Sequence, residues 1–368
     1  MKIMHLLPSL SSGGVEQVVL ELCRGMREHG VESVVVSGGG GLVKDVEVAG
    51  AKHYTRSIGK KSPATLWQVW RMAQLLRAEK PNILHIHSRV PAWVGCLAMR
   101  LLRREERPHL LTTFHGFYSV NRYSAIMTRG ERIIAVSRFT KQHILEAYPS
   151  TLPERIIVID NSIDLSEHNP TYRPSAEWLQ RWRAEHPQLS GKYVLCLPSR
   201  ITRWKGGEHL VPILAGLKAL GIPAHIIIPG ETKKGKEGFL RELKARFAAA
   251  GLSEDVTWLG LRRDIREIFC VSDVVLSLSL KPETFGKVSL EALALGRPVA
   301  GYAHGGVGEQ LEQFLPEGMI PVGDTDAMAA RLAEWYRTPP VLKKPVGSPY
   351  RREDMIQAHL ELYHQLIS

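Results

Sequence analysis

Two basic residues in the second half of the chain have types and spacing suited to binding an anion. Arg200 and Lys205 stand in "LPSRITRWKGGEHLV", after an apolar run of strand type and before a helical pattern. At the carboxyl end of a strand, beside a helix N-terminus, they can converge on a diphosphate, the arginine as a fork and the lysine as a point charge. The alternative is a pair of surface cations that bind nothing.

Two carboxylates follow in "KPETFGKVSLEALALGRPVAG", where seven residues separate Glu283 from Glu291. Glu283 precedes the predicted helix and can accept a hydrogen bond from a sugar hydroxyl. Glu291 lies two turns into that helix and can bind a ribose diol, as acidic residues do in nucleotide sites. A glycosidase uses paired carboxylates as general acid and nucleophile. The neighbouring cations favour the nucleotide interpretation.

A third candidate lies near the start of the chain, where Gly13 and Gly14 separate an apolar run from an amphipathic pattern. Adjacent glycines permit positive φ and remove the Cβ atoms that keep a ligand from the free N–H groups of a helix. Such a turn can bind an anion, or it can be a tight turn without a ligand. Its spacing is not that of the dinucleotide fingerprint.

Short apolar runs alternate with helical patterns in both halves. Runs such as "KIMHLL", "NILHIH" and "YVLCLPS" are typical of buried parallel strands, and stretches such as Val15–Glu28 and Leu66–Ala78 separate them. This alternation predicts an α/β chain of two Rossmann-like, doubly wound domains, with ligands at the carboxyl ends of the strands. We expect domains over 1–165 and 166–348, and a closing helix over 349–368 that crosses back to the first domain.

Positive charge is concentrated in the first half. Residues 1–160 hold 22 basic and 13 acidic side chains, a net of +9 out of +11 for the whole chain. No RNP, zinc-finger or helix-turn-helix pattern accompanies the charge, which argues against nucleic acid. An anionic membrane surface, a phosphorylated acceptor or a merely solvated surface explains the same asymmetry.

Most of this excess positive charge lies in one segment, since the residues from Arg56 to Arg107 include eleven basic and three acidic side chains. It includes Lys60, Lys61 and a helical pattern with Trp67 and Trp70. A basic amphipathic helix can lie on a membrane. Taken alone, however, the apolar stripe is expected to be the face packed on the sheet.

Other features give weaker signals. The four cysteines lie far apart, which is typical of a reduced, cytoplasmic chain, and no apolar run reaches the roughly 20 residues of a membrane span. Asp324 and Asp326 have a metal-binding spacing, but they precede a helical pattern and fit an N-cap better. His85 and His87 lack an evident third zinc ligand, and we expect them to be polar residues facing the site. No metal is therefore predicted.

Taken together, these segments resemble the retaining glycosyltransferases of family 4, which have the GT-B fold of two Rossmann-like domains facing each other across a cleft. The resemblance runs nearly end to end. Its most specific part is the order of an R-x4-K-G loop and an E-x7-E segment that contains "FG". The segments that carry it are "SSGG", "LHIHS", "TTFHG", "AVSRFTK", "DNSID", "SRITRWKGG", "ETFGKVSLE", "GGVGE" and "MIQAHLELYHQL".

The resemblance implies a metal-independent hexosyltransferase that moves a sugar, with retention of configuration, from a nucleoside diphosphate sugar to an acceptor hydroxyl. It implies an acceptor domain followed by a nucleotide-sugar-binding domain. A UDP-sugar is the favoured donor, and no cofactor is expected. The implied roles are as follows: Arg200, Lys205, Gly13 and Gly14 hold the diphosphate, Glu283 and the amides of Phe285, Gly286, Lys287 and Val288 bind the donor sugar, Glu291 binds the ribose, and His115 lies near the reacting centre.

The expected acceptor is an oligosaccharide or a glycolipid of the bacterial cell envelope, such as the lipopolysaccharide core. The expected location is the cytoplasm, with reversible binding at the inner face of the plasma membrane and no nucleic acid partner. Two alternatives stay open: a nucleotide-sugar epimerase or hydrolase on the same scaffold, and a non-catalytic nucleotide-binding, membrane-associated scaffold. One departure from the family is Asn161-Ser162, where Asn-Gly is common, so a left-handed backbone there is in question.

Overall fold

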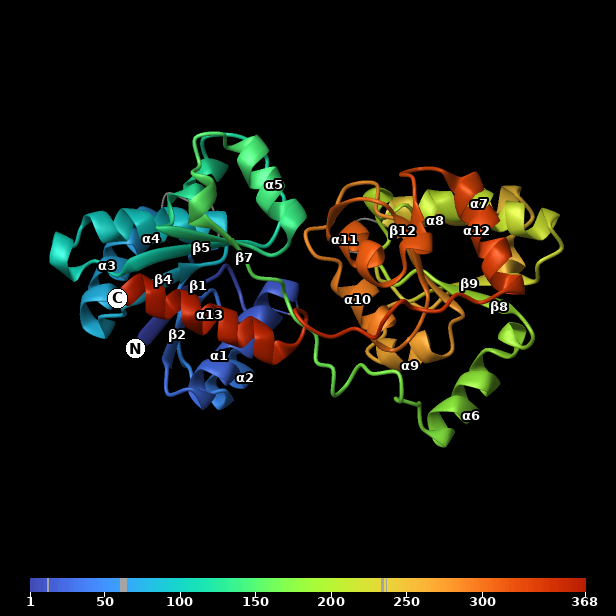
Figure 1. Cartoon of the computed structure of the whole chain (residues 1–368), viewed down its shortest axis with the longest axis horizontal. Helices are drawn as coiled ribbons and strands as arrows, with labels where there is room; N and C mark the ends of the chain where they lie inside the picture. Colours follow the sequence, from blue (N-terminus) through green and yellow to red (C-terminus); the bar gives the residue numbers. More distant parts are fainter. Residues whose placement is uncertain (12, 60–64, 233–234, 236) are drawn as a thin grey trace. The chain divides into compact units, whose positions relative to one another are not determined.

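A computed structural model describes residues 1–11, 13–59, 65–232, 235 and 237–368. The chain forms two compact units (Figure 1). The first contains Met1–Ser162 and Ser348–Ser368, and the second contains Ile163–Gly347. The sequence predicts the divisions after residues 165 and 348, and the structure has them after Ser162 and Gly347.

The first unit is built on a parallel sheet with the order β3-β2-β1-β4-β5-β6-β7. The strand order reverses between β1 and β4, and in such sheets ligands bind beyond the carboxyl ends of the strands near this point. The edge strand β3 was not predicted, because its four residues are polar or half-buried. The strands are β1 (Lys2–Leu6), β2 (Glu32–Ser37), β3 (Lys52–Thr55), β4 (Ile83–Ile86), β5 (His109–Phe114), β6 (Arg132–Ala135) and β7 (Ile156–Val158).

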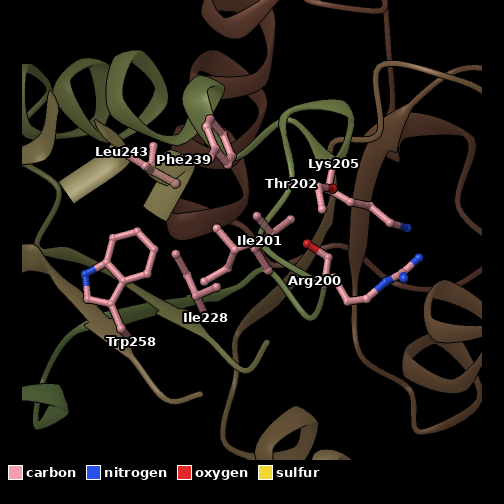
Figure 2. Close-up of a pocket in the computed structure, with 11 residues that line it drawn as sticks. Arg200, Ile201, Thr202, Lys205, Ile228, Phe239, Leu243 and Trp258 are labelled. Carbon is pink, nitrogen blue, oxygen red and sulfur yellow. The ribbon is translucent and has the colours of Figure 1, made fainter. Parts of the chain in front are cut away.

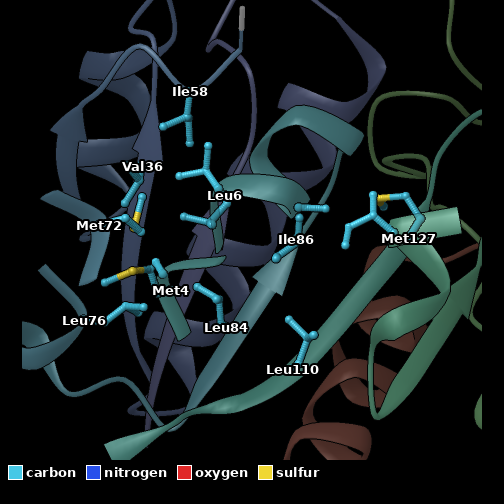
Figure 3. Close-up of a cluster of buried hydrophobic side chains, with 14 of the residues drawn as sticks. Met4, Leu6, Val36, Ile58, Met72, Leu76, Leu84, Ile86, Leu110 and Met127 are labelled. Atoms are coloured by element: carbon cyan, nitrogen blue, oxygen red, sulfur yellow. The ribbon is translucent and has the colours of Figure 1, made fainter. Parts of the chain in front are cut away.

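Helices cover both faces of this sheet. Side chains alternate between the faces along each strand. Met4, Leu6, Leu84 and Ile86 therefore pack together under α3 and α4 (Figure 3), and their neighbours in the chain face α1 and α13. The helices are α1 (Gly14–Glu28), α2 (Val43–Val48), α3 (Thr65–Glu79), α4 (Arg89–Arg100), α5 (Arg138–Ala147) and α13 (Arg352–Ile367), with 3-10 turns η1 (Arg104–Glu106), η2 (Ser124–Arg129) and η3 (Pro153–Arg155).

The last helix, α13, belongs to the first unit. Its Tyr363 is completely buried, and its apolar residues share a core with α1 and the sheet. A Cβ atom at Gly25 of α1 would lie 2.2 Å from Cδ1 of Ile356. Only glycine therefore lets α1 and α13 approach this closely, and α13 covers the sheet face that carries His5 and His85.

The second unit has a parallel sheet with the order β10-β9-β8-β11-β12-β13. Its order also reverses, between β8 and β11, so the loops after these two strands are neighbours. Its elements are α6 (Ala176–Glu185), η4 (Pro187–Leu189), β8 (Tyr193–Cys196), η5 (Arg203–Lys205), η6 (Gly207–His209), α7 (Leu210–Ala219), β9 (Ala224–Ile228), α8 (Glu237–Ala249), η7 (Ser253–Asp255), β10 (Val256–Trp258), α9 (Ile265–Cys270), β11 (Val274–Ser277), α10 (Lys287–Ala294), β12 (Val299–Tyr302), α11 (Gly305–Phe314), η8 (Pro316–Gly318), β13 (Met319–Ile320) and α12 (Thr325–Arg337).

These two units account for the alternating pattern of the sequence. Among the described residues, no helix combines the length and apolar character that crossing a bilayer requires.

Candidate functional site

The loops after β8 and β11 are held together by backbone contacts in the second unit. Gly206 has φ +71°, and a Cβ atom there would lie 2.0 Å from the carbonyl oxygen of Leu278. The N–H of Leu280 donates to the carbonyl oxygen of Trp204 at 2.7 Å. Glycine is thus required at 206, and the contact brings Lys205 beside the loop that carries Glu283.

Lys205 and Glu283 form a half-buried ion pair. Nζ of Lys205 lies 2.8 Å from Oε1 of Glu283, and the two side chains are 16% and 24% exposed. The hydroxyl of Ser279 also donates to this carboxylate, and His304 Nε2 lies 2.7 Å from the Ser279 carbonyl oxygen. Two predicted site residues are therefore in direct contact beside a hollow of about 30 Å³, which Ser199 and Ser289 also line.

Arg200 lies on the same loop as Lys205. Figure 2 shows both side chains extending in the same direction, away from the apolar side chains of Trp258, Ile228 and Leu243. Arg200 is exposed at the surface. The charged ends of Arg200 and Lys205 thus face one region of the second unit, as binding of a single anionic group requires.

The segment from Glu283 to Val288 turns sharply into α10. Gly286 has φ +81°, and a Cβ atom there would lie 2.5 Å from Cγ2 of Val307. The N–H of Gly306 donates to the Glu283 carbonyl oxygen at 2.8 Å, and Nε2 of Gln310 donates to the Phe285 carbonyl oxygen at 2.6 Å. The turn is therefore fixed by α11. It presents the start of α10, with Lys287 and Val288 as its first residues, next to the Lys205–Glu283 pair.

Glu291 lies one turn further along α10 and lines a different cavity. This cavity has a volume of about 500 Å³ and is also lined by Glu167, His168, Arg263 and Arg266. Glu283 therefore precedes α10 and Glu291 lies within it, and the two side chains line two separate hollows. The larger one has the size of a small-molecule site.

In the first unit, Gly13 and Gly14 begin α1. Neither residue uses the positive φ that glycine permits, because Gly13 is extended with φ −152° and Gly14 already has helical backbone. A Cβ atom at Gly13 would lie 2.3 Å from Oε2 of Glu16, whereas one at Gly14 would meet nothing within 4 Å. The side chain of Glu16 folds over Gly13, so the open approach to the helix start is at Gly14.

His115 follows β5 and ends a row of histidine rings. Its Nε2 atom lies 3.0 Å from Nδ1 of His87, and Nε2 of His87 lies 3.1 Å from Nδ1 of His5. Burial lowers the pKa of both His5 and His115 to about 3. These rings are neutral at pH 7, and each link in the row carries one proton, so the tautomer of His87 fixes that of His115.

A second branch of this cluster reaches α13. His85 Nδ1 lies 2.9 Å from the Tyr363 hydroxyl, and His85 Nε2 lies 2.7 Å from the Thr113 hydroxyl. His85 and His87 are 0% and 1% exposed, so their predicted place as polar residues facing a cleft is wrong. His5 was missed, although its parallel pairing with His85 brings the rings together. The sequence signal that could have identified His5 is a single histidine at the centre of an otherwise apolar strand.

His5, His85 and His87 also form a possible metal-ligand set, since one nitrogen from each lies within 4.8 Å of the others. Both nitrogens of His85 and both of His87 already have hydrogen-bond partners. A metal ion would have to replace several of these bonds. The geometry therefore fits a hydrogen-bonded cluster better than a metal site.

Two other predicted features have structural roles. The carboxylate of Asp324 accepts a hydrogen bond from the N–H of Ala327 at 2.8 Å, as the N-cap of α12. Ser162 is buried, and its hydroxyl donates to Glu21 at 3.0 Å. Among described non-glycine residues only Lys80 has positive φ, so the backbone at Ser162 does not need glycine.

Comparisons with known proteins match both units. Residues 12–167 match the Glycosyltransferase Family 4 model, and residues 180–352 match the Glycosyl transferases group 1 model. The chain is 24% identical over 351 residues to the 2-deoxystreptamine N-acetyl-D-glucosaminyltransferase of Streptomyces fradiae, with 86% of this chain and 80% of that protein covered.

Solved structures show the same fold. A glycosyltransferase from Rickettsia africae superposes with a TM-score of 0.85 at 25% identity, with 100% of this chain and 98% of that chain covered. HepE from Anabaena, solved in complex with UDP and glucose, superposes with a TM-score of 0.80 at 21% identity, with 99% and 100% covered. The predicted fold class is confirmed.

Proposed function

Because the chain is a glycosyltransferase with the GT-B fold, made of a Family 4 domain and a group 1 domain, we propose that it transfers a hexose with retention of configuration from a UDP-sugar to an acceptor hydroxyl. The single observation that carries the proposal is the Lys205–Glu283 pair, with Arg200 on the same loop. In this arrangement, two cations that can bind a diphosphate lie next to a carboxylate that can accept hydrogen bonds from sugar hydroxyls. The UDP in the solved Anabaena relative supports the choice of nucleotide.

In this proposal, the ion pair opens when the donor binds. Lys205 moves from Glu283 to the incoming diphosphate, where Arg200 adds its guanidinium fork. The carboxylate of Glu283 then accepts hydrogen bonds from the sugar, and the amides at the start of α10 face its other polar atoms. The cavity beside Glu291 accepts the nucleoside, with Glu291 on the ribose.

The chemistry is electrostatic rather than covalent. Arg200, Lys205 and helix N–H groups stabilise the negative charge that develops on the leaving diphosphate, so no divalent ion is required. The departing phosphate oxygen takes the proton of the acceptor hydroxyl on the same face of the sugar, which gives retention. From the first unit, the neutral ring of His115 contacts the donor sugar, and the N–H groups at Gly14 contact the phosphates.

We further propose a glycolipid acceptor of the bacterial cell envelope, such as lipopolysaccharide core, reached from the cytoplasmic side of the membrane. Trp67 and Trp70 of α3 are 56% and 53% exposed, which corrects the expectation that they pack on the sheet, and the guanidinium of Arg71 lies 4.4 Å from the Trp67 ring centre. Exposed tryptophans beside basic residues suit the interface of an anionic bilayer. Lys60 and Lys61, which belong to the same basic segment, lie outside the described residues.

The experiment is a mass-spectrometric screen of nucleotide sugars against glycolipid fractions and soluble oligosaccharides. Its control is the Glu283→Gln variant. Release of UDP together with a glycosylated acceptor supports the proposal. Release of free or altered sugar without an acceptor would instead indicate a hydrolase or epimerase, and nucleotide binding without turnover would indicate a scaffold.

A further inference from the structure

The first unit contains a cavity of its own, at the opposite end of β5 from His115. Its volume is about 270 Å³, and it lies between α4 and η2 over the start of β5. Leu110 in its floor is the second residue of β5, whereas His115 follows the carboxyl end of that strand. About five residues of extended chain separate them by about 16 Å, so this cavity is distinct from the position of His115.

Four arginines from different segments surround this cavity. They are Arg100 at the end of α4, Arg107 after η1, Arg122 before η2 and Arg129 at the end of η2. All four are exposed. Across the part of the chain that the structure describes, no acidic side chain lines the cavity and none of these guanidinium groups forms an ion pair.

The four charges act on one small space. Arg100 and Arg129 both act to lower the pKa of the Cys96 thiol in the cavity wall, although burial raises that pKa to about 11. Nε of Arg107 donates to the Leu102 carbonyl oxygen at 3.2 Å, and among the described residues its two Nη groups have no hydrogen-bond partner. Several guanidinium groups around one hollow repel each other, and an anion that accepts hydrogen bonds from them removes this repulsion.

The floor of the cavity is apolar. Trp93, Met99, Leu110 and Ile126 form it. The indole N–H of Trp93 donates to the Tyr123 carbonyl oxygen at 3.0 Å. Its single polar group is therefore satisfied, and the ring contributes apolar surface to the cavity. A bare inorganic anion would leave this floor uncovered, whereas a phosphate ester would cover it with its organic part.

We propose that this cavity binds a phosphate ester, with the phosphate held by the four arginines and the organic part lying on the apolar floor. The volume fits a head of glycerol phosphate or sugar phosphate size, either as a soluble molecule or as the head group of an anionic lipid. The site is independent of the proposed transfer reaction, because no residue in it belongs to the candidate donor site.

The test uses the full chain with Lys205→Ala as the background, so that the second unit contributes less phosphate binding. Calorimetry measures affinity for glycerol 3-phosphate, and sedimentation measures binding to phosphatidylglycerol and phosphatidylcholine vesicles. The site variant is Arg100→Gln with Arg129→Gln. The matched control is Arg24→Gln with Lys44→Gln, which removes two exposed charges elsewhere in the same unit.

The site variant should weaken glycerol 3-phosphate binding at least tenfold, and the control variant less than twofold. The same pattern for phosphatidylglycerol vesicles without glycerol 3-phosphate binding would assign the site to a lipid head group. Equal losses in the two variants, or no binding of either probe to the background protein, would overturn the proposal.

Discussion

Lys205 and Glu283, 78 residues apart in the chain, meet with Nζ 2.8 Å from Oε1 at the carboxyl end of the second sheet. Because β8 and β11 are neighbours in that sheet, the two loops that follow them deliver a cation and an anion to the same place. In the proposed function, an incoming diphosphate competes with Glu283 for Lys205.

Removing either proposed phosphate ligand should weaken UDP binding. A hydrogen bond to a charged group contributes about 1.5–3 kcal/mol, so Arg200→Ala and Lys205→Ala should each reduce affinity about tenfold or more by calorimetry. Arg203→Ala is the matched control, because Arg203 lies on the same loop but pairs with Glu208 and Glu242. Unchanged affinity in the first two variants, with folding confirmed by circular dichroism, would disprove these roles.

Substitutions of Glu283 and Glu291 should have different effects on turnover and on UDP binding. Glu283→Gln should reduce turnover while UDP alone still binds, because Glu283 is proposed to contact the sugar. Glu291→Gln should weaken UDP binding itself, because Glu291 lines the separate, larger cavity. Equal effects of both changes on UDP affinity would contradict the assignment, and a covalent glycosyl-enzyme at Glu283 detected by intact mass would indicate a glycosidase-like nucleophile.

His87 should act on turnover through His115. We expect His87→Phe to lower kcat about tenfold or more, with less than a threefold change in donor KM. The reason is that His115 loses the hydrogen bond that orients its ring and fixes its tautomer. His87→Gln should recover part of the rate, since an amide can hydrogen-bond to His115. His85→Phe, equally buried but bonded to Thr113 and Tyr363, is the control for packing. An equal loss of kcat in the His85 variant would refute the positioning role.

Stability should depend on pH through the buried histidines. Burial lowers the pKa of His5 to about 3, whereas a histidine in the unfolded chain has a pKa near ~6.5. Between these values the unfolded state binds a proton that the folded state does not, so the free energy of unfolding falls as the pH drops below about 6.5. One such histidine accounts for about 2 kcal/mol at pH 5.

Urea unfolding at pH 7.5 and pH 5 measures this effect. His87, His115 and His359 also have pKa values lowered by burial, so the total loss should exceed that of His5 alone. The His5→Asn variant should show a smaller difference between the two pH values. The same free energy of unfolding for the unmodified protein at both pH values would argue against a neutral buried cluster.

Membrane binding should be electrostatic and reversible. The protein should float with anionic vesicles at low salt and be released at high salt, since each basic side chain near an anionic surface contributes about 1 kcal/mol. Replacing Lys60, Lys61, Arg103 and Arg104 with glutamine should abolish flotation and leave UDP affinity unchanged. No binding to anionic vesicles at low salt would leave the basic segment as a solvated surface.

The fold and the donor loops could largely be predicted from the sequence. Buried parallel strands are short apolar runs, and cations directly after such a run must lie at the carboxyl edge of a sheet. The strand order could not be read in this way, so the adjacency of β8 and β11, which joins Lys205 to Glu283, became visible only in the structure. The edge strand β3 was missed because its exposed positions weaken the apolar signal.

The errors have physical causes as well. The paired glycines permit positive φ, but Gly13 is extended and leads directly into α1, with the carboxylate of Glu16 folded over it. Trp67 and Trp70 were expected in the core, yet α3 packs on the sheet through Val69, Met72 and Leu76. The histidine cluster depends on the pairing of β1 with β4, which no local pattern specifies.

The most direct test of the central claim is an NMR time course of the reaction with an α-linked UDP-sugar and an acceptor found in the screen. The anomeric proton of the product reports its configuration, and the uracil signals report release of UDP. Retaining transfer predicts an α-linked product formed in equal amount with UDP. A β-linked product, or free sugar in place of a glycosylated acceptor, would contradict it.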